Sequence, residues 1–176
     1  MVNDLLITVD AEDNVIGEIA KLEGHRKGIL HRAFSIFIFN PEGKWLMQQR
    51  AFNKYHSGGL WTNTCCSHPH PGQLTEEAAI NRLYEEMGIW CNIQHIFEFT
   101  YKASFGNGLT EYEYDHIFTG VTDTLPEINK EEVHSYKFMS FEEIKTEVEE
   151  NPDHFTEWFK IIYEKVNSCN VEKSFS

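Results

Sequence analysis

The sequence predicts one α+β domain in which helices sandwich a mixed central β-sheet. Several β-prone runs surround one internal amphipathic helix, and two further helical segments follow near the C-terminus. The 176 residues fit a single domain, since domains commonly span about 100–200 residues. No repeat, low-complexity tract or Pro/Gly/Ser linker divides the chain. We therefore expect a single domain over residues 1–176, with a short polar tail after about residue 167.

The expected strands share a β-prone composition and are bounded by turn residues. They are residues 5–9, 15–18, 33–40, 45–50, 61–66, 93–104, 111–121 and 134–139. An acidic turn at residues 10–14 joins the first two as a hairpin, and Pro41-Glu42-Gly43 joins the third to the fourth. The fifth ends in the loop at residues 68–72, whose prolines can continue neither a helix nor a strand ladder.

The clearest expected helix covers residues 75–87, where Thr75 can act as the N-cap and Gly88 is placed to end the helix. Residues 140–143 have the form of a capping box and begin a second helix. Pro152 opens the last helix. Apolar side chains recur at helical spacing in the first and last of these helices: Ala79, Ile80, Leu83, Met87, Trp158, Phe159, Ile161 and Ile162.

The charge of the chain restricts its partners. Fifteen basic residues against 28 acidic ones give a formal net charge of −13. Such a field repels polyanions, so we expect no nucleic-acid partner. A small anionic ligand would need local compensation by a few basic side chains or by metal ions.

No segment of the sequence suggests a membrane or an export route. The longest apolar stretch lies around residues 33–39, far short of the ~20 residues that span a bilayer. Residues 1–10 lack both the basic region and the long apolar region of a secretory signal. We expect a cytoplasmic protein with no membrane partner, and the sequence favours no particular oligomeric state.

A set of histidines and carboxylates is a candidate metal site: His25, His31, His68, Glu111 and Glu113. Glu111 and Glu113 are two positions apart in an expected strand, so their carboxylates leave the same face. Imidazole and carboxylate ligands together suit a hard or borderline divalent cation. The alternative is that these histidines are scattered over the surface and that the acidic strand face is merely solvated.

The segment TNTCCSHPHP holds a second candidate. A thiol there could act as a nucleophile, as a proton donor, or as a zinc ligand through Cys65, Cys66, His68 and His70. Adjacent cysteines in a strand point to opposite faces, which favours one buried thiol and one that faces a pocket. The alternative is that both are small core residues, as free cysteines usually are.

Arg82 and Glu86 are four apart on one helix face. They provide either an anion-binding guanidinium beside a metal-binding carboxylate or an ordinary intrahelical ion pair. Lys21, Arg50 and Lys54 are the other basic residues near these motifs, and each alone could be a solvated surface charge.

Five spaced motifs are similar to those of one known family. They are LHRAFSIFIFN (residues 30–40), QQRAFNK (48–54), WTNTCCSHPHPG (61–72), YEYD (112–115) and TEWFKII (156–162). Together they resemble the type I isopentenyl-diphosphate delta-isomerases of the Nudix superfamily. The resemblance implies a Nudix-type α/β/α sandwich and the interconversion of isopentenyl diphosphate and dimethylallyl diphosphate, a step of isoprenoid precursor biosynthesis.

The chain departs from the usual Nudix box at two positions. Ser67 stands where the box opens with Gly, and Arg82 stands where hydrolases have a metal-binding Glu. A guanidinium in place of a carboxylate suits holding a diphosphate more than hydrolysing it.

The resemblance also implies a role for each matching residue. Its catalytic groups fall on Cys66, Glu113, Tyr101 and Trp158, and its diphosphate-binding groups on Lys21, Arg50, Lys54 and Arg82. Its metal ligands fall on His25, His31, His68, Glu111 and Glu113, which would take Mn²⁺, Mg²⁺ or Zn²⁺, and on Glu86, which would take a diphosphate-linked Mg²⁺.

The implied reaction adds a proton at a terminal CH₂ and removes one from C2 through a tertiary carbocation. Cys66 and Glu113 would transfer these protons, with Tyr101 hydrogen-bonded nearby and the π face of Trp158 turned to the cation. Two rivals are a nucleoside-diphosphate-type hydrolase, which requires a cluster of metal-binding carboxylates, and a His/Glu metal-binding or ligand-sensing module without chemistry.

Overall fold

The computed structural model describes residues 4–174, with side chains as far as Asn170. Its strands form one nine-stranded sheet. They are β1 (Leu5–Val9), β2 (Val15–Ala20), β3 (His31–Phe39), β4 (Trp45–Arg50), β5 (Trp61–Thr62), β6 (Cys65–Ser67), β7 (Gln94–Ser104), β8 (Thr110–Val121) and β9 (Val133–Met139). The ends of the expected 1–176 domain, residues 1–3 and 175–176, lie outside the described part of the chain.

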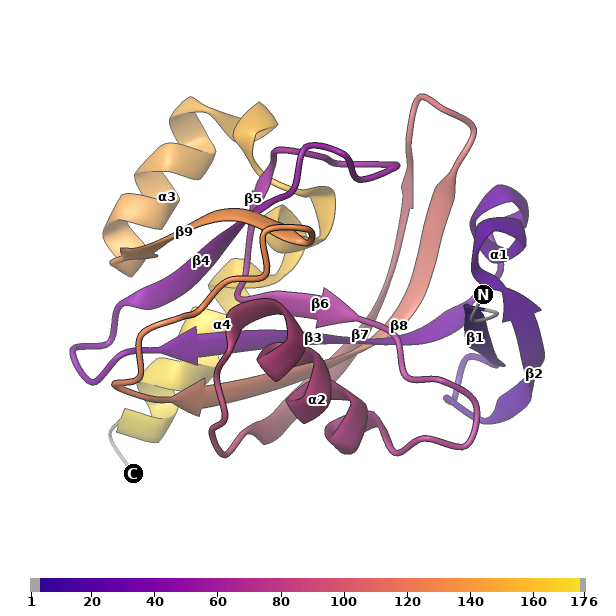
Figure 1. The fold of residues 1–176 in the computed structure, drawn as a ribbon, viewed down its shortest axis with the longest axis horizontal. Coiled ribbons are helices and arrows are strands. Elements are labelled where there is room, and N and C mark those ends of the chain that lie inside the picture. The colour runs from indigo at the N-terminus through magenta and orange to yellow at the C-terminus, as the bar shows by residue number, and fades with distance from the viewer. Residues whose placement is uncertain (1–3, 175–176) are drawn as a thin grey trace.

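Strand β3 organises the sheet. It runs parallel to β8 and antiparallel to β1, β4 and β6. Strands β4 and β9 pair antiparallel, and β7 and β8 form the long hairpin that rises from the sheet in Figure 1. The mixed sheet expected from the sequence is therefore confirmed.

Helices cover both faces of this sheet. They are α1 (Lys21–Lys27), α2 (Thr75–Met87), α3 (Phe141–Glu150) and α4 (Glu157–Ser174). One apolar core packs Leu83 and Met87 of α2 against Ile36 of β3. The other packs α3 and α4 against the opposite face, through residues such as Ile144 and Phe159. Figure 1 shows α2 on one side of the sheet and the C-terminal helices on the other, which confirms the α/β/α sandwich.

Local sequence patterns correctly predicted the ends of several helices. Helix α2 has the expected bounds and ends at Gly88, which adopts the left-handed conformation with φ 67°. Ser140 caps α3, since its hydroxyl accepts a hydrogen bond from the Glu143 backbone N–H. The polar segment after residue 167 continues α4 as far as Ser174.

Other expectations were wrong. The N-cap of α2 is Leu74 and no side chain caps it, so Thr75 does not have that role. Pro152 opens a separate 3₁₀ turn, Pro152–His154, and α4 begins only at Glu157. The single strand expected at residues 61–66 is broken into β5 and β6, because the Asn63 and Thr64 side chains turn inward and bond to backbone carbonyls of β3 and β4.

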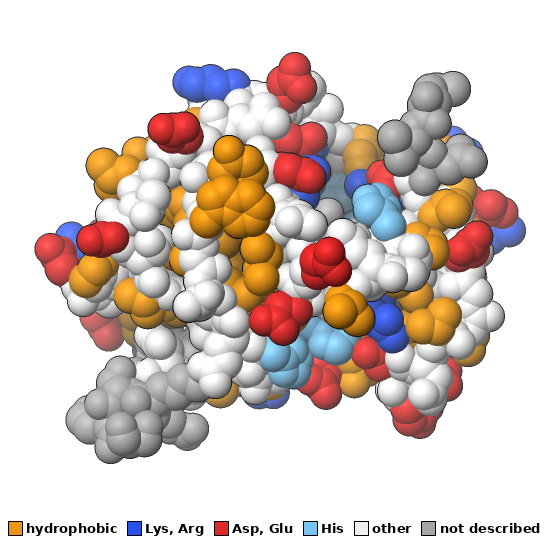
Figure 2. Space-filling view, turned by 60° about the horizontal axis from the view of Figure 1, so that its bottom comes forward, with side chains coloured by type: hydrophobic (Ala, Val, Ile, Leu, Met, Phe, Trp, Pro, Cys, Tyr) orange, Lys and Arg blue, Asp and Glu red, His pale blue; other side chains and the backbone are white. Residues whose placement is uncertain are grey.

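The surface mixes charged, polar and scattered apolar side chains, with histidines beside acidic groups on the face shown in Figure 2. Among the described residues, no helix combines the length and the apolar character that crossing a bilayer requires.

Candidate active site

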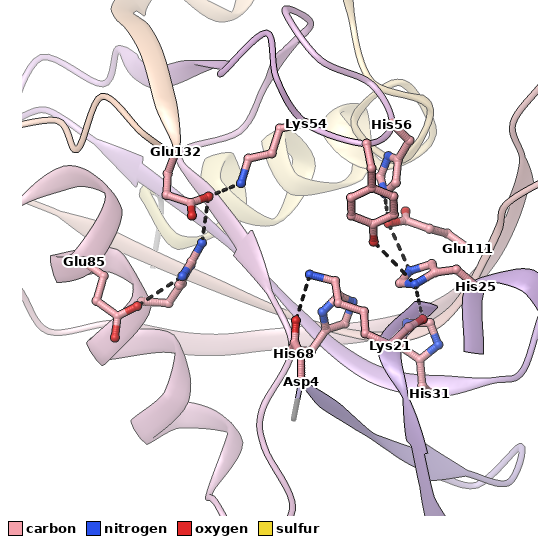
Figure 3. Close-up of polar contacts among 12 residues, drawn as sticks. Asp4, Lys21, His25, His31, Lys54, His56, His68, Glu85, Glu111 and Glu132 are labelled. Atoms are coloured by element: carbon pink, nitrogen blue, oxygen red, sulfur yellow. Dashed lines mark hydrogen bonds and ion pairs between the residues drawn. The ribbon is translucent and has the colours of Figure 1, made fainter. Parts of the chain in front are cut away.

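The histidines and carboxylates predicted to bind metal come together at one end of the sheet, and Figure 3 shows His25, His31, His68 and Glu111 among them. His31 begins β3, and its register partner on the parallel strand β8 is Glu113. Glu111 lies two residues earlier on the same face of β8, and both carboxylates are buried. His25 comes from α1 and His68 from the loop after β6, so four segments build this His/Glu cluster.

The imidazoles of His25 and His31 are oriented by the backbone. Nδ1 of His25 lies 2.7 Å from the Lys21 carbonyl oxygen, and Nδ1 of His31 lies 2.8 Å from that of Ile29. A proton on Nδ1 satisfies each carbonyl and leaves the Nε2 lone pair free. Both Nε2 atoms are buried without a hydrogen-bond partner, and one ligand nitrogen each of His25, His31 and His68 lies within 4.8 Å of the others. This is the arrangement of histidines that hold a cation.

The charges of the cluster also fit a cation. Burial opposes ionisation of Glu113, but the neighbouring imidazoles of His31, 3.5 Å away, and His68, 2.8 Å away, lower its pKa well below the ordinary value. Burial and the charge of Glu113 oppose ionisation of Glu111, but the neighbouring imidazoles of His25 and His56 keep its pKa lowered. Burial lowers the pKa of His68 to about 4, so this imidazole is neutral. Two buried carboxylates beside imidazole nitrogens favour a divalent cation.

Metal binding here is expected to release a proton. Burial alone lowers the pKa of His31, but hydrogen bonding and charge from Glu113 raise it above the ordinary value. A proton on His31 competes with a cation for Nε2, so the affinity for metal should fall as the pH drops through that raised pKa. Calorimetric titration in buffers of different ionisation enthalpy measures the released proton. Identical apparent enthalpies in all buffers would contradict the expected competition.

A narrow inner cavity of about 70 Å³ adjoins the cluster. Glu113 and Tyr101 line it from β8 and β7, Cys66 from β6, and Trp158 from α4. The Tyr101 hydroxyl donates to Glu113 and lies 2.8 Å from Oε2 of Glu111. Strand β3 separates β6 from β8, so Cys66 and Glu113 reach the cavity from different sides. The predicted catalytic side chains therefore share one cavity.

The vicinal cysteines have different surroundings, as strand alternation predicts. Cys65 is fully buried in the core beneath α2, whereas Cys66 is partly exposed and lines the inner cavity. The Cys66 thiol lies 3.2 Å from Oδ1 of Asn63 and 3.5 Å from the Ser35 hydroxyl. Burial, and the charge of Asp115, raise the pKa of Cys66, so the thiol keeps its proton at neutral pH.

A wider hollow of about 420 Å³ opens next to the inner cavity, and Lys21, Lys54 and His68 line both. The hollow adds Arg82 from α2. Its basic groups have acidic partners: Lys54 and Arg82 both pair with Glu132, and Lys21 lies 3.4 Å from Asp4 (Figure 3). Arg50 lies deeper, with its guanidinium 5.3 Å from the centre of the Trp158 ring. The four predicted diphosphate-binding residues thus surround two connected cavities.

Glu86 lies apart from the His/Glu cluster. Its carboxylate is buried between Gln48, whose amide donates to Oε1 at 3.0 Å, and Arg82, whose Nε donates to Oε2 at 2.6 Å. The intrahelical ion pair that the spacing allowed is present. Glu86 is absent from the lining of the hollow, so its role as a metal ligand stays a prediction.

Sequence reasoning missed His56. It is buried in the loop after β4, its Nε2 lies 3.1 Å from Oε1 of Glu111, and its ring stacks on Phe105. With His25 and Glu111 it forms a second group of potential metal ligands. His56 lies two residues after the motif at residues 48–54. That closeness in sequence was the one signal that could have marked His56 as a site residue.

The sheet lies between α2 and the C-terminal helices and carries buried candidate metal ligands at one end. This architecture is that of a Nudix protein, and the NUDIX domain model matches residues 29–159. Isopentenyl-diphosphate Delta-isomerase of Serratia proteamaculans is 46% identical over 171 residues, covering 97% of this chain and 96% of the relative. The enzyme of that name from Pectobacterium atrosepticum is 48% identical over 161 residues, covering 92% and 90%. The chain therefore belongs to the isopentenyl-diphosphate Delta-isomerase family, as the sequence motifs indicated.

Among solved structures, DR0079 from Deinococcus radiodurans aligns with a TM-score of 0.69 at 16% identity, covering 84% of this chain and 90% of that chain. At this identity the likeness concerns the fold alone.

Proposed function

We propose that this protein interconverts isopentenyl diphosphate and dimethylallyl diphosphate, the activity that the names of its relatives indicate. The observation that carries the proposal is the pair of proton-transfer groups, Cys66 and Glu113, in one small cavity that adjoins a basic hollow. Moving a double bond by one carbon needs both groups, since one proton is added and another is removed.

The two cavities suggest how the substrate lies. The outer hollow has the volume and the basic side chains for a diphosphate, with Lys21, Lys54 and Arg82 as its donors. The inner cavity is too narrow for more than a short branched hydrocarbon. Binding energy from the diphosphate then orients the alkene between Cys66 and Glu113. The ion pairs with Glu132 hold Lys54 and Arg82 in place before substrate arrives.

Proton transfer follows from the protonation states of the pair. The Cys66 thiol keeps its proton because burial raises its pKa, whereas the lowered pKa of Glu113 leaves a carboxylate that can accept one. Tyr101 donates a hydrogen bond to Glu113 and fixes its orientation. The reaction is reversible, so each group donates in one direction and accepts in the other.

Trp158 stabilises the cationic state of the substrate. Its ring is buried and lines the inner cavity, and a desolvated cation–π contact contributes about 2 kcal/mol. The same ring excludes water, which would otherwise trap a tertiary carbocation as an alcohol.

The His/Glu cluster is the proposed site of a divalent cation, which would supply Lewis-acid stabilisation of negative charge when bound. His25, His31 and His68 would hold it together with Glu111 and Glu113, and its identity is Mn²⁺, Mg²⁺ or Zn²⁺. A second cation, Mg²⁺, is proposed at Glu86, which requires Arg82 to turn from this carboxylate toward the diphosphate. The partner is a small-molecule diphosphate, and we place the protein in the cytoplasm.

Hydrolysis of a nucleoside diphosphate is not favoured. Arg82 stands where a hydrolase of this fold has a metal-binding Glu, and it pairs with Glu85 and Glu86, so α2 is one carboxylate short of the cluster that hydrolysis would need. A metal-binding module without chemistry would have no use for a thiol beside the alkene-sized cavity.

Incubation with isopentenyl diphosphate in D₂O tests the proposal. We expect dimethylallyl diphosphate with deuterium in a methyl group, because solvent-exchangeable groups handle both protons. NMR of the product detects the label. Release of inorganic phosphate would instead support the hydrolase, and tight binding without turnover would support the metal-binding or sensing module.

A further inference from the structure

A second group of metal-ligand atoms lies on the other face of β8. Along this strand, Glu111 and Glu113 point to the buried cluster, whereas His116 is an odd number of residues away and points to the opposite face. There it meets His95 and Glu98 of β7, and one ligand atom from each of the three lies within 4.8 Å of the others.

A β-bulge creates this grouping. Glu98 is the direct register partner of His116, so their side chains share a face. His95 is three residues before Glu98 and would point to the opposite face of a regular strand. The register shift between His95 and Phe97 leaves Ile96 unpaired and turns His95 to the face of Glu98 and His116.

The spacing of the ligand atoms fits a tetrahedral cation. Nε2 of His95 lies 3.3 Å from Nδ1 of His116 and 3.1 Å from Oε2 of Glu98. Zinc–ligand bonds of about 2.0–2.2 Å at tetrahedral angles place neighbouring ligand atoms about 3.4 Å apart. The side chains of His95 and Glu98 are each 42% exposed, so a solvent molecule can complete the coordination.

The opposite nitrogen of His116 is held by Asp13. Nε2 of His116 donates to Oδ2 of Asp13 at 2.9 Å, which leaves the Nδ1 lone pair directed at His95. Asp13 is itself fixed by Arg32, which donates to its Oδ1 and to its backbone carbonyl at 2.8 and 2.7 Å. A carboxylate on the far nitrogen of an imidazole is the usual support of a metal-bound histidine.

We propose that His95, Glu98 and His116 bind a borderline divalent cation, Zn²⁺ being the best match, with Asp13 as a positioning residue. This site is separate from the proposed catalytic cation. When occupied, it ties the β7–β8 hairpin to the turn between β1 and β2, through Asp13.

Equilibrium dialysis of the full metal-stripped chain against Zn²⁺ tests the site. The wild type should bind one Zn²⁺ more per chain than the double variant His95→Gln/His116→Gln. The matched control His154→Gln removes an exposed histidine elsewhere and should bind as the wild type does. Asp13→Asn keeps a residue that tolerates the positive φ of 66° at this position, and it should weaken the additional binding event about 10–100-fold.

Equal Zn²⁺ content in the wild type and the double variant would overturn the proposal. Failure of the proposed catalytic site to bind Zn²⁺ gives a different result. It would lower the Zn²⁺ content of the wild type and of the double variant equally and leave the difference between them unchanged. Histidine ring NMR gives an independent readout: signals that disappear in His95→Gln and His116→Gln identify these rings, and they should shift on Zn²⁺ addition. Unshifted signals would contradict binding here.

Discussion

Cys66→Ala is expected to lower turnover on the order of 10³-fold in both directions, because it removes one of the two proposed proton-transfer groups from the inner cavity. Ser35 and Ser67 lie next to Cys66 in the lining of this cavity. Their hydroxyl groups are too weakly acidic to replace the thiol as a proton donor. The fold and the metal content should be unchanged, since the hydrogen bonds of the Cys66 sulfur go to Ser35 and Asn63 and not to the histidines of the cluster. Steady-state assays together with elemental analysis measure both effects.

Cys65→Ala is the matched control. Cys65 is adjacent in sequence and fully buried in the core beneath α2, so its loss should cost about 1 kcal/mol of unfolding free energy and retain most activity. An allylic epoxide analogue that protonation activates should attach to Cys66, as peptide mapping would detect. An active Cys66→Ala protein, or a label on Cys65, would refute the proposal that Cys66 is the thiol that faces the substrate.

Features that depend on local chemistry could be predicted from the sequence. The period of Ala79, Leu83 and Met87 and the position of Gly88 were enough to bound α2, since each acts within the helix itself. Strand alternation correctly separated Cys65 from Cys66 for the same reason.

Features that depend on distant contacts could not be predicted. Helix α1 is short, lacks a side-chain cap and contains Gly24, which packs closely on Leu6 and Ile19 of the neighbouring strands. A helix this short depends largely on such tertiary packing for its stability. It carries His25 into the cluster, so no local pattern could show that this histidine meets the other candidate ligands. His56 was missed because stacking on Phe105 and the contact with Glu111 position it from residues far along the chain.

The β7 bulge is a further example. Alternation along residues 93–104 places His95 and Glu98 on opposite faces, and only the pairing register with β8 reverses this. A register cannot be read from one strand, because it is set by both partners and by the turn that joins them.

Removal of metal is expected to have an effect as large as loss of Cys66. His68 donates to Oε2 of Glu113 at 2.8 Å and Tyr101 donates to Oε1, so both oxygens of the proposed proton-transfer carboxylate accept hydrogen bonds within the His/Glu cluster. A cation held by His25, His31 and His68 would supply electrostatic stabilisation beside this carboxylate. Several kcal/mol of electrostatic stabilisation are lost without the cation, so turnover should fall on the order of 10³-fold after chelation and return when a divalent metal is added.

His68→Ala should reproduce this loss permanently, because it deletes one ligand of the His/Glu cluster. Bound metal and turnover should fall together, and added metal should restore little. His134→Ala, which removes an exposed histidine of β9, is the matched control and should keep both. The His/Glu cluster accounts for catalysis only if metal content and rate change in parallel across these proteins. Elemental analysis can show that a protein sample contains no metal. Full turnover by such a sample would refute the assignment of the metal ligands: His25, His31, His68, Glu111 and Glu113.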